Sequence, residues 1–271
     1  MLYDKMYNMM NMYRFILCFY AAALLFGCQS RKTDVTFVHY NVGVFSKYER
    51  SGVDVVARAV KEMGGDVVSL NELDSCAMRT GVVDQIAAFA EEMGGWNMSY
   101  ASAMPFNGGA YGVGIVSSPE FEILHSCKVP LPRFGGYEPR ALAVVEYKDF
   151  VFASTHLDLV KDSQLLQLEV INNYVDSVYA GAGKPVFLAG DFNCEPDGPT
   201  IDKVRETWTL LTPEDYTYPS DMPRKCIDYI FVRPRGKRVE VVSAYVPRNL
   251  ETADLATASD HLPAALTVSI R

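Results

Sequence analysis

The feature that most constrains this chain is a series of short apolar segments that each end in an acidic, amide or histidine side chain. Short apolar segments bounded by turn residues are typical of strands buried in a sheet. A buried carboxylate is costly unless it is paired, hydrogen-bonded or bound to a metal. The polar residues in this position are Asn41, Asn71, Glu72, His156, Asp158, Asp191, Asn193, Asp228, Asp260 and His261. Any one of them alone reads more simply as a turn residue or a cap, but the whole set predicts one polar site at converging strand ends.

The remaining pattern alternates strands and helices without a long linker. We predict strands at 34–41, 66–70, 111–117, 121–128, 141–147, 150–155, 185–189, 227–232, 239–245 and 264–270, and helices at 51–63, 82–93 and 163–179. Ser51 and Asp54 form a capping-box pattern at the start of the first helix. Many strands with few helices favour an α+β domain of two packed, mostly antiparallel β-sheets flanked by helices.

Length and charge limit the size of the fold and the class of partner. The 271 residues are 49% hydrophobic, enough for one large domain or two small ones, and we expect one domain over 34–271. The net charge of −8 gives no bulk attraction for polyanions, so nucleic acid is possible but not favoured as a partner. The densest basic segment, 233–238, reads better as a solvated turn between two strands than as a binding patch.

The N-terminal region does not resemble part of the folded domain. The apolar run 15–26 follows Arg14, is too short to span a bilayer and has the length of a signal-peptide core. It ends in Leu25-Phe26-Gly27-Cys28, which resembles the lipobox of bacterial lipoproteins. We therefore expect a signal peptide at 1–27, a lipid on Cys28, a tether at 28–33, and export to the cell envelope on a membrane anchor. The alternative is a plain secretory signal with an incidental cysteine.

The cysteines of the remaining chain do not indicate a zinc site. Cys76, Cys127, Cys194 and Cys226 include no C-x-x-C motif and no close His–Cys pairing. An exported protein meets an oxidising compartment, so one or two disulfides are possible. We favour buried free thiols, because a domain of this size needs no cross-links.

The polar motifs occur in the order found in a known family. They are Asn41, Asn71-Glu72, Thr155-His156-Leu157-Asp158, Gly190-Asp191-Phe192-Asn193, Ile227-Asp228-Tyr229-Ile230 and Ser259-Asp260-His261. Over essentially all of 33–271 they resemble the endonuclease/exonuclease/phosphatase superfamily. The resemblance implies a DNase I-like, four-layer αββα sandwich with its active site at one end. It also implies a metal-dependent phosphoric ester hydrolase.

The resemblance also implies a role for each motif residue. Glu72 would be the principal ligand of Mg²⁺ (or Mn²⁺), and Asn41 and Asp260 would complete or support the metal site. Asp191 and Asn193 would contact the attacking water and the phosphate, while His156 would hydrogen-bond a phosphoryl oxygen. His261 would be the catalytic histidine, oriented by Asp228, and Arg140 and Asp158 would contact the substrate. Either Asp191 or the Asp228–His261 pair could take the proton of the water.

Two positions depart from the family's usual pattern. Asn71 stands where the family commonly has Gln, and Gln164 stands where it often has Arg. Both departures put in doubt any transfer of substrate from better-known members. Of the remaining histidines, His39 shares the face of Asn41 by period-two counting and is a candidate for lining the pocket. His125 is expected on the surface.

Three function hypotheses follow. The leading one is Mg²⁺-dependent hydrolysis of a small phosphoester or lipid head group by a monomeric, exported lipoprotein. The alternatives are a secreted metal-dependent nuclease and a non-catalytic surface-binding lipoprotein. All motif residues are present, which argues against a fold that has lost its activity.

Overall fold

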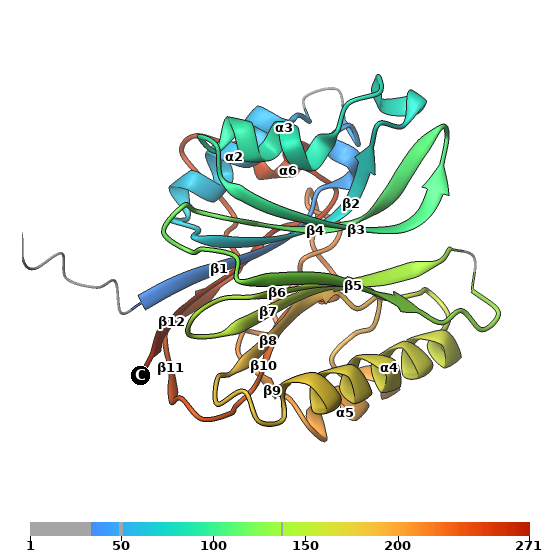
Figure 1. Ribbon diagram of the computed structural model, residues 1–271. Coiled ribbons are helices and arrows are strands. Elements are labelled where there is room, and N and C mark those ends of the chain that lie inside the picture. The colour runs from blue at the N-terminus through green and yellow to red at the C-terminus, as the bar shows by residue number, and fades with distance from the viewer. Residues whose placement is uncertain (1–33, 49–50, 137) are drawn as a thin grey trace, which may run out of the picture. The chain divides into compact units, whose positions relative to one another are not determined.

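Two six-stranded sheets packed face to face form the centre of the protein (Figure 1). The structure is a computed structural model and describes residues 34–48, 51–136 and 138–271. The first sheet has the order β11 (Val239–Tyr245), β12 (Ala264–Ile270), β1 (Asp34–Asn41), β2 (Val67–Ser75), β4 (Gly109–Ser117), β3 (Asn97–Phe106). The second has the order β5 (His125–Leu131), β6 (Arg140–Glu146), β7 (Val151–His156), β8 (Val186–Asp191), β10 (Asp228–Arg233), β9 (Thr209–Leu210).

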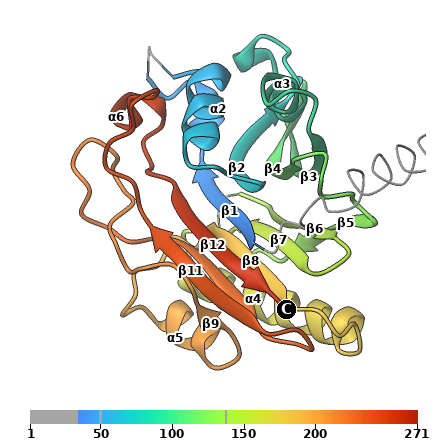
Figure 2. The ribbon, with the colours of Figure 1, turned by 90° about the vertical axis from the view of Figure 1, so that its left-hand side faces the viewer.

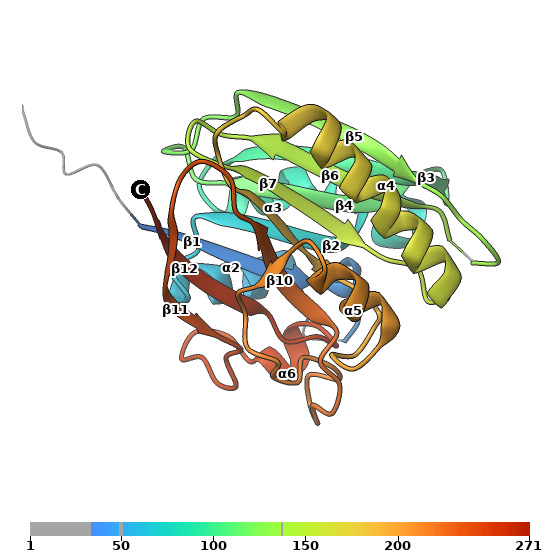
Figure 3. The same cartoon turned by 90° about the horizontal axis from the view of Figure 1, so that it is seen from below.

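Helices cover the outer face of each sheet and complete four layers. Helices α2 (Val53–Glu62), α3 (Gln85–Glu92) and α6 (Leu255–Ala258) lie on the first sheet, and α4 (Lys161–Tyr179) and α5 (Pro199–Arg205) lie on the second (Figures 1 and 3). The 3-10 turns η1 (Gly43–Phe45) and η2 (Met78–Thr80) follow β1 and β2. The predicted α+β sandwich is therefore confirmed.

Apolar packing between the sheets fixes their relative position. Phe37 of β1 stacks on Phe152 of β7, with ring centroids 4.8 Å apart, and lies 4.5 Å from the ring of Phe187 on β8. All three side chains are fully buried. Each such aromatic ring contributes a large apolar area to the core. The packing holds β1 of one sheet against β7 and β8 of the other, the strands that end in motif residues (Figure 2).

Strand register brings the motif residues to a single edge. Among the described strands, every neighbouring pair is antiparallel except β1 with β2 and β7 with β8. Parallel strands end at the same edge, and Asn41 accordingly pairs with Asn71 and His156 with Asp191. Asp228 begins the antiparallel β10 and lies opposite Asp191. The two parallel pairs thus place carboxyl ends from both sheets together.

Several sequence predictions need correction or completion. The capping box at Ser51 is wrong: helix α2 begins after Gly52 without a side-chain cap. Ser51 Oγ instead accepts from Tyr48 N and donates to Thr257 O. These two bonds occupy the hydroxyl that would otherwise cap the helix. Strand β3 was not predicted, and β2 continues beyond the predicted end at 70.

The basic segment does not form an open binding patch, and the cysteines meet the favoured interpretation only in part: Cys226 is buried, but Cys127 and Cys194 are half-buried and Cys76 is exposed. Arg233 and Arg235 both pair with Asp176, Lys237 pairs with Asp149, and Arg238 pairs with Glu240. The segment is therefore neutralised by neighbouring acids. Within the described residues, all four cysteines are free thiols. In this part of the chain no helix is long and apolar enough to cross a bilayer. Cys28 and the predicted signal peptide lie outside the described residues.

Candidate active site

The predicted site residues gather around one cleft of about 840 Å³. Those that line it are Glu72, Arg140, His156, Asp158, Asp191, Asn193, Asp260 and His261. Asn41 and Asp228 lie directly beneath, almost fully buried, and are hydrogen-bonded to lining residues. The predicted convergence of these side chains is confirmed.

Left-handed backbone shapes the loops around the cleft. Glu72 (φ 58°) lies in the bulge of β2, and Asn193 (φ 48°) follows β8. Val44 (φ 51°) lies in η1, which also lines the cleft. Such backbone costs roughly 1–3 kcal/mol per residue and persists only where surrounding structure enforces it. Its presence in three segments of one cleft supports a functional role for the cleft.

Gln85 of α3 enforces two of these segments. Its Oε1 accepts from Asp74 N at 2.7 Å, just after the bulge that carries Glu72. Its Nε2 donates to Val44 O at 2.6 Å. Gln85 is buried, so one side chain joins the bulge of β2 to the turn η1.

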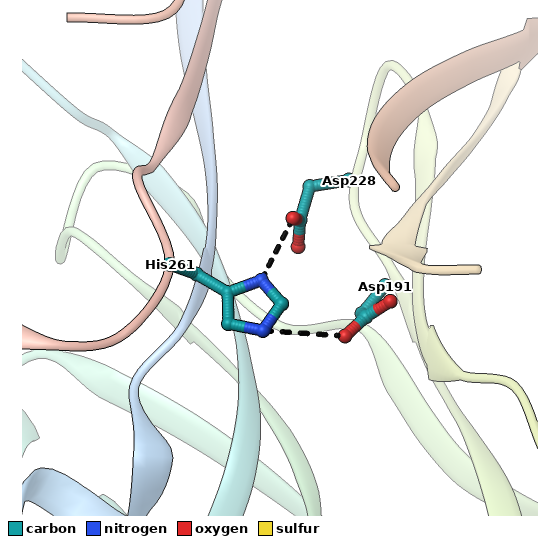
Figure 4. A group of neighbouring side chains, drawn as sticks. All are labelled: Asp191, Asp228 and His261. Carbon is teal, nitrogen blue, oxygen red and sulfur yellow. Dashed lines mark hydrogen bonds and ion pairs between the residues drawn. The ribbon is translucent and has the colours of Figure 1, made fainter. Parts of the chain in front are cut away.

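Asp228, beneath the cleft, and His261, which lines it, form a hydrogen-bonded pair. Figure 4 shows this pair with Asp191. His261 Nδ1 lies 2.8 Å from Asp228 Oδ2, as the sequence predicted for this pair. The other ring nitrogen, Nε2, faces Asp191 Oδ2 at 3.7 Å. Burial alone would lower the pKa of His261, but the Asp228 carboxylate outweighs burial and raises the pKa to about 10. Burial would raise the pKa of Asp228, but His261 and His39 hold it well below its usual value.

Asp191 and His156 titrate in the opposite sense. Burial raises the pKa of Asp191 to about 7, and the nearby charge of Asp228 adds to the increase. Burial and the guanidinium of Arg140 hold the pKa of His156 well below 6.5. His156 Nδ1 lies 3.3 Å from Arg140 Nη1, and its Nε2 lies 3.0 Å from Asn193 Nδ2. At the ends of β7 and β8, a neutral His156 therefore lies beside an Asp191 carboxyl whose pKa is close to neutral pH.

Asn41 joins the two halves of the site. Its Nδ2 donates to Glu72 Oε1 at 3.1 Å and to Asp191 Oδ2 at 3.2 Å. Its Oδ1 accepts from Gly43 N at 3.2 Å. In this arrangement Asn41 orients Glu72 through its amide nitrogen, which fits the supporting part of its predicted metal role.

The oxygen donors of Glu72 and Asp260 suit a hard divalent cation. Asp260 Oδ1 is buried and has no hydrogen-bond partner in the described part of the chain, and Glu72 lines the same cleft. Asp191, Asp228 and His261 also have ligand atoms within 4.8 Å of one another. Hydrogen bonds from Asn41, His39 and Thr217 occupy those carboxylates. On the other side, Asn41 donates to Glu72 Oε1 and Lys47 Nζ pairs with Asp260 Oδ2, but Asp260 Oδ1 keeps no partner among the described residues. The Glu72–Asp260 side is therefore the better candidate for a metal.

The two residues that depart from the family pattern support the site from below. Asn71 Oδ1 accepts from Asp191 N at 3.0 Å. Gln164 Nε2 donates to the carbonyls of Asp158 and Asn193 at 2.7 and 3.1 Å. Both side chains fix the loops that follow β7 and β8. The departures therefore alter the scaffold of the site and leave its motif residues in place.

Some cleft residues carry no signal in the sequence. They are Lys47, Arg79, Phe106, Tyr111, Tyr218 and Lys225. They come from loops and strand ends far apart along the chain, which only the fold brings together. Thr217 also carries no signal in the sequence; it is buried beneath the cleft, and its Oγ1 donates to Asp228 Oδ2 at 2.5 Å. The period-two position of His39 suggested that it lines the pocket. His39 instead lies fully buried beneath the cleft, hydrogen-bonded to Asp228.

Similarity to solved structures agrees with the fold. The endonuclease/exonuclease/phosphatase protein of Bacteroides vulgatus has 18% identity and a TM-score of 0.73, covering 89% of this chain and 100% of its own. The mannosyl-6-phosphatase of Bacteroides thetaiotaomicron has 17% identity and a TM-score of 0.70, covering 86% of this chain and 99% of its own. The human Nocturnin catalytic domain has 17% identity and a TM-score of 0.66, covering 88% of this chain and 94% of its own. No curated protein matches the sequence.

The sequence profile of the Endonuclease/Exonuclease/phosphatase family matches residues 38–261. This range begins in β1 and ends at His261, so it spans both sheets and every motif that lines the cleft. The chain belongs to the endonuclease/exonuclease/phosphatase family and is a phosphoric ester hydrolase.

Proposed function

We propose that the protein hydrolyses a small phosphoester or a lipid head group with the help of Mg²⁺ (or Mn²⁺). The observation that carries this proposal is the row Asp228–His261–Asp191 beside the oxygen donors of Glu72 and Asp260. Hydrolysis of a phosphoester needs a positioned water, a group that accepts its proton, and positive charge near the phosphoryl oxygens.

The residues of the row can position the water and take its proton. A water between Asp191 and His261 Nε2 would face both candidate bases. Asp191 exchanges a proton near neutral pH because burial raises its pKa to about 7. Asp228 fixes the proton of His261 on Nδ1, so that Nε2 is directed to the cleft. Asp228 holds His261 in its charged form near neutral pH because it raises the pKa of His261 to about 10, so Asp191 is the group that would take the proton of the water.

The substrate phosphate would lie between the two sheets. Arg140 and His156 stand together on the second sheet and can donate to phosphoryl oxygens. Glu72 and Asp260, with Asn41 beside Glu72, would hold the divalent cation. When bound, that cation would stabilise the negative charge that develops on the phosphate. Asp158 lines the same cleft; its Oδ1 accepts from Val160 N, and its buried Oδ2 has no partner among the described residues and could accept from a hydroxyl of the substrate.

Charge favours small esters over nucleic acid. The chain carries a net charge of −8, and its densest basic segment is paired with Asp176, Asp149 and Glu240. Nonspecific nucleic-acid binding depends on free basic groups along a surface. The mannosyl-6-phosphatase, a structural neighbour at 17% identity, is named for a sugar phosphate. A metal-dependent nuclease is the second candidate.

The test is an activity screen of the protein from Gln29 onward. The substrates are p-nitrophenyl phosphate, bis-p-nitrophenyl phosphate, a hexose 6-phosphate, a lipid phosphodiester and plasmid DNA, each with Mg²⁺ and with EDTA. The His261→Ala variant serves as the blank. Metal-dependent turnover of a small ester or lipid above the blank supports the proposal. Turnover of plasmid DNA alone identifies the nuclease, and no turnover above the blank refutes both candidates.

We also propose that the protein is an exported, monomeric lipoprotein anchored through Cys28. The support is the short apolar run before Gly27-Cys28 and the polar segment that follows. An anchor of this kind would keep the cleft close to a membrane surface, which suits a lipid head group as one of the substrate classes.

A further inference from the structure

Asp228 lies between two imidazole rings, and only one of them faces the cleft. Its Oδ2 is 2.8 Å from His261 Nδ1 and accepts from Thr217 Oγ1 at 2.5 Å. Its Oδ1 is 2.9 Å from His39 Nε2. His39 and Asp228 are both almost completely buried, so this side of the carboxylate is shielded from bulk solvent. His39 is therefore the hydrogen-bond partner of Oδ1.

The far side of His39 continues into a chain of buried side chains. His39 Nδ1 lies 3.0 Å from Ser69 Oγ, and Ser69 Oγ lies 2.6 Å from Ser154 Oγ. Asn71 Nδ2 donates to Ser154 Oγ at 3.2 Å. Asn71 Oδ1 accepts from the backbone N–H of Asp191 at 3.0 Å. The chain thus links Asp228 to Asp191 through both sheets.

Donor and acceptor counting fixes the two ends of this series of hydrogen bonds. The Asp191 N–H requires Oδ1 of Asn71 as its acceptor, so Nδ2 of Asn71 is the end that donates to Ser154. Ser154 can then donate to Ser69, and Ser69 to Nδ1 of His39. A carboxylate oxygen only accepts, so Nε2 of His39 carries a proton and donates it to Asp228 Oδ1. Every side chain in this series of hydrogen bonds, from Asp228 through His39 to Asp191, has a partner in this arrangement.

We propose that His39 is a positioning residue for the catalytic pair: its Nε2–H holds the Asp228 carboxylate in the orientation that His261 requires. With Oδ1 fixed by His39, the lone pairs of Oδ2 are directed to His261 Nδ1 and Thr217. Loss of His39 would leave Oδ1 buried without a donor, which is unfavourable for a charged group. The carboxylate would turn to regain a partner and weaken its hold on His261.

A buried histidine with satisfied hydrogen bonds can also serve packing alone. The two roles differ in one respect, because a positioning residue acts only through Asp228. Replacement of His39 should then have little effect once Asp228 has lost its charge. A packing role would lower activity and stability equally in both backgrounds.

The kinetic test is a double-mutant cycle, and it rests on the proposed function. We expect His39→Leu to lower kcat by about 10- to 100-fold with KM nearly unchanged. His39→Gln, whose amide nitrogen can reach the position of Nε2, should recover most of kcat. In the Asp228→Asn background, His39→Leu should lower kcat by no more than about twofold. Equal losses in both backgrounds, or no rescue by Gln, would overturn the proposal.

A second readout does not need turnover. The ring N–H that His261 shares with Asp228 should give a proton resonance far downfield, assigned by its loss in His261→Gln. His39→Leu should shift or broaden this resonance, while His39→Gln should preserve it. The control is Thr36→Val at the opposite end of β1, where Thr36 bonds Thr267 at 3.0 Å. An unchanged resonance in His39→Leu would refute the proposal even if no substrate is found. If His39→Leu fails to fold, His39→Gln and His39→Asn replace it in the test. Asn is too short to reach Asp228, so His39→Asn should change the resonance and lower kcat, whereas His39→Gln should preserve both.

Discussion

At the scale of single residues, Asp228 carries a buried charge at the start of β10, directly before an apolar run that ends at Val232. Its carboxylate is held by His261, His39 and Thr217, so the strand tolerates it. Asp228→Asn should keep the fold but lower kcat by about 100-fold or more, because an amide can present its N–H to His261 and favour the wrong tautomer. Steady-state kinetics with circular dichroism check this. A kcat within twofold of the parent would contradict the pairing.

The same pair predicts how stability depends on pH in EDTA. The pKa of His261 is raised from 6.5 to about 10, so its contribution is complete below pH 6.5 and declines as the pH rises towards 10. The pKa of Asp228 is lowered from 3.8, so its contribution is present above pH 3.8 and is lost in acid. The stability difference between the parent and Asp228→Asn should therefore be largest between about pH 4 and 6.5.

Urea unfolding across this pH range measures that difference, with Thr36→Val as a variant whose difference from the parent should not vary with pH. A parent-minus-variant difference that grows between pH 7 and 10 would show that His261 is not held in its charged form by Asp228.

At the scale of elements, the sequence predicted the bounds of a strand well where its residues follow one clear apolar pattern. The predicted bounds of β1, β11 and β12 match the structure because alternating or continuous apolar residues fill these strands. Strand β3 was missed because its burial is mixed and it contains Pro105. The bulge at Glu72 could not be read either, since no glycine marks it and its support comes from Gln85 on another element.

The supporting role of Gln85 can be tested directly. Gln85→Ala leaves Asp74 N and Val44 O without their partner, so the free energy of unfolding should fall by about 2–4 kcal/mol. The metal concentration for half-maximal activity should rise, because the bulge that carries Glu72 loses its link to α3. Urea unfolding and a Mg²⁺ titration of activity measure both effects. Glu91→Ala, an exposed change on the same helix, is the control, and equal behaviour of the two variants would exclude the role.

At the scale of the whole domain, the site and the core are separate parts of the structure. Three clusters of buried apolar residues lie on and between the sheets, and none depends on a metal ligand. EDTA should therefore abolish hydrolysis while the far-ultraviolet circular dichroism spectrum remains unchanged. Addition of Mg²⁺ should restore activity without refolding. Activity that survives EDTA would remove the metal role of Glu72 and Asp260, and unfolding in EDTA would show that the metal is structural.

The motif order identified the site from sequence, but the location of the whole protein rests on residues before Asp34. We expect residues 1–27 to be removed and Cys28 to carry acyl chains at the new N-terminus. Each buried methylene contributes about 0.8 kcal/mol, so several chains on one cysteine would hold the domain on a bilayer. Mass spectrometry of the N-terminal peptide from native membranes should find an acylated Cys28, and Cys28→Ser should no longer partition into detergent. An unmodified peptide that begins upstream of Cys28, or recovery of all the protein in the cytoplasm, would reject export by this route while leaving the catalytic predictions unaffected.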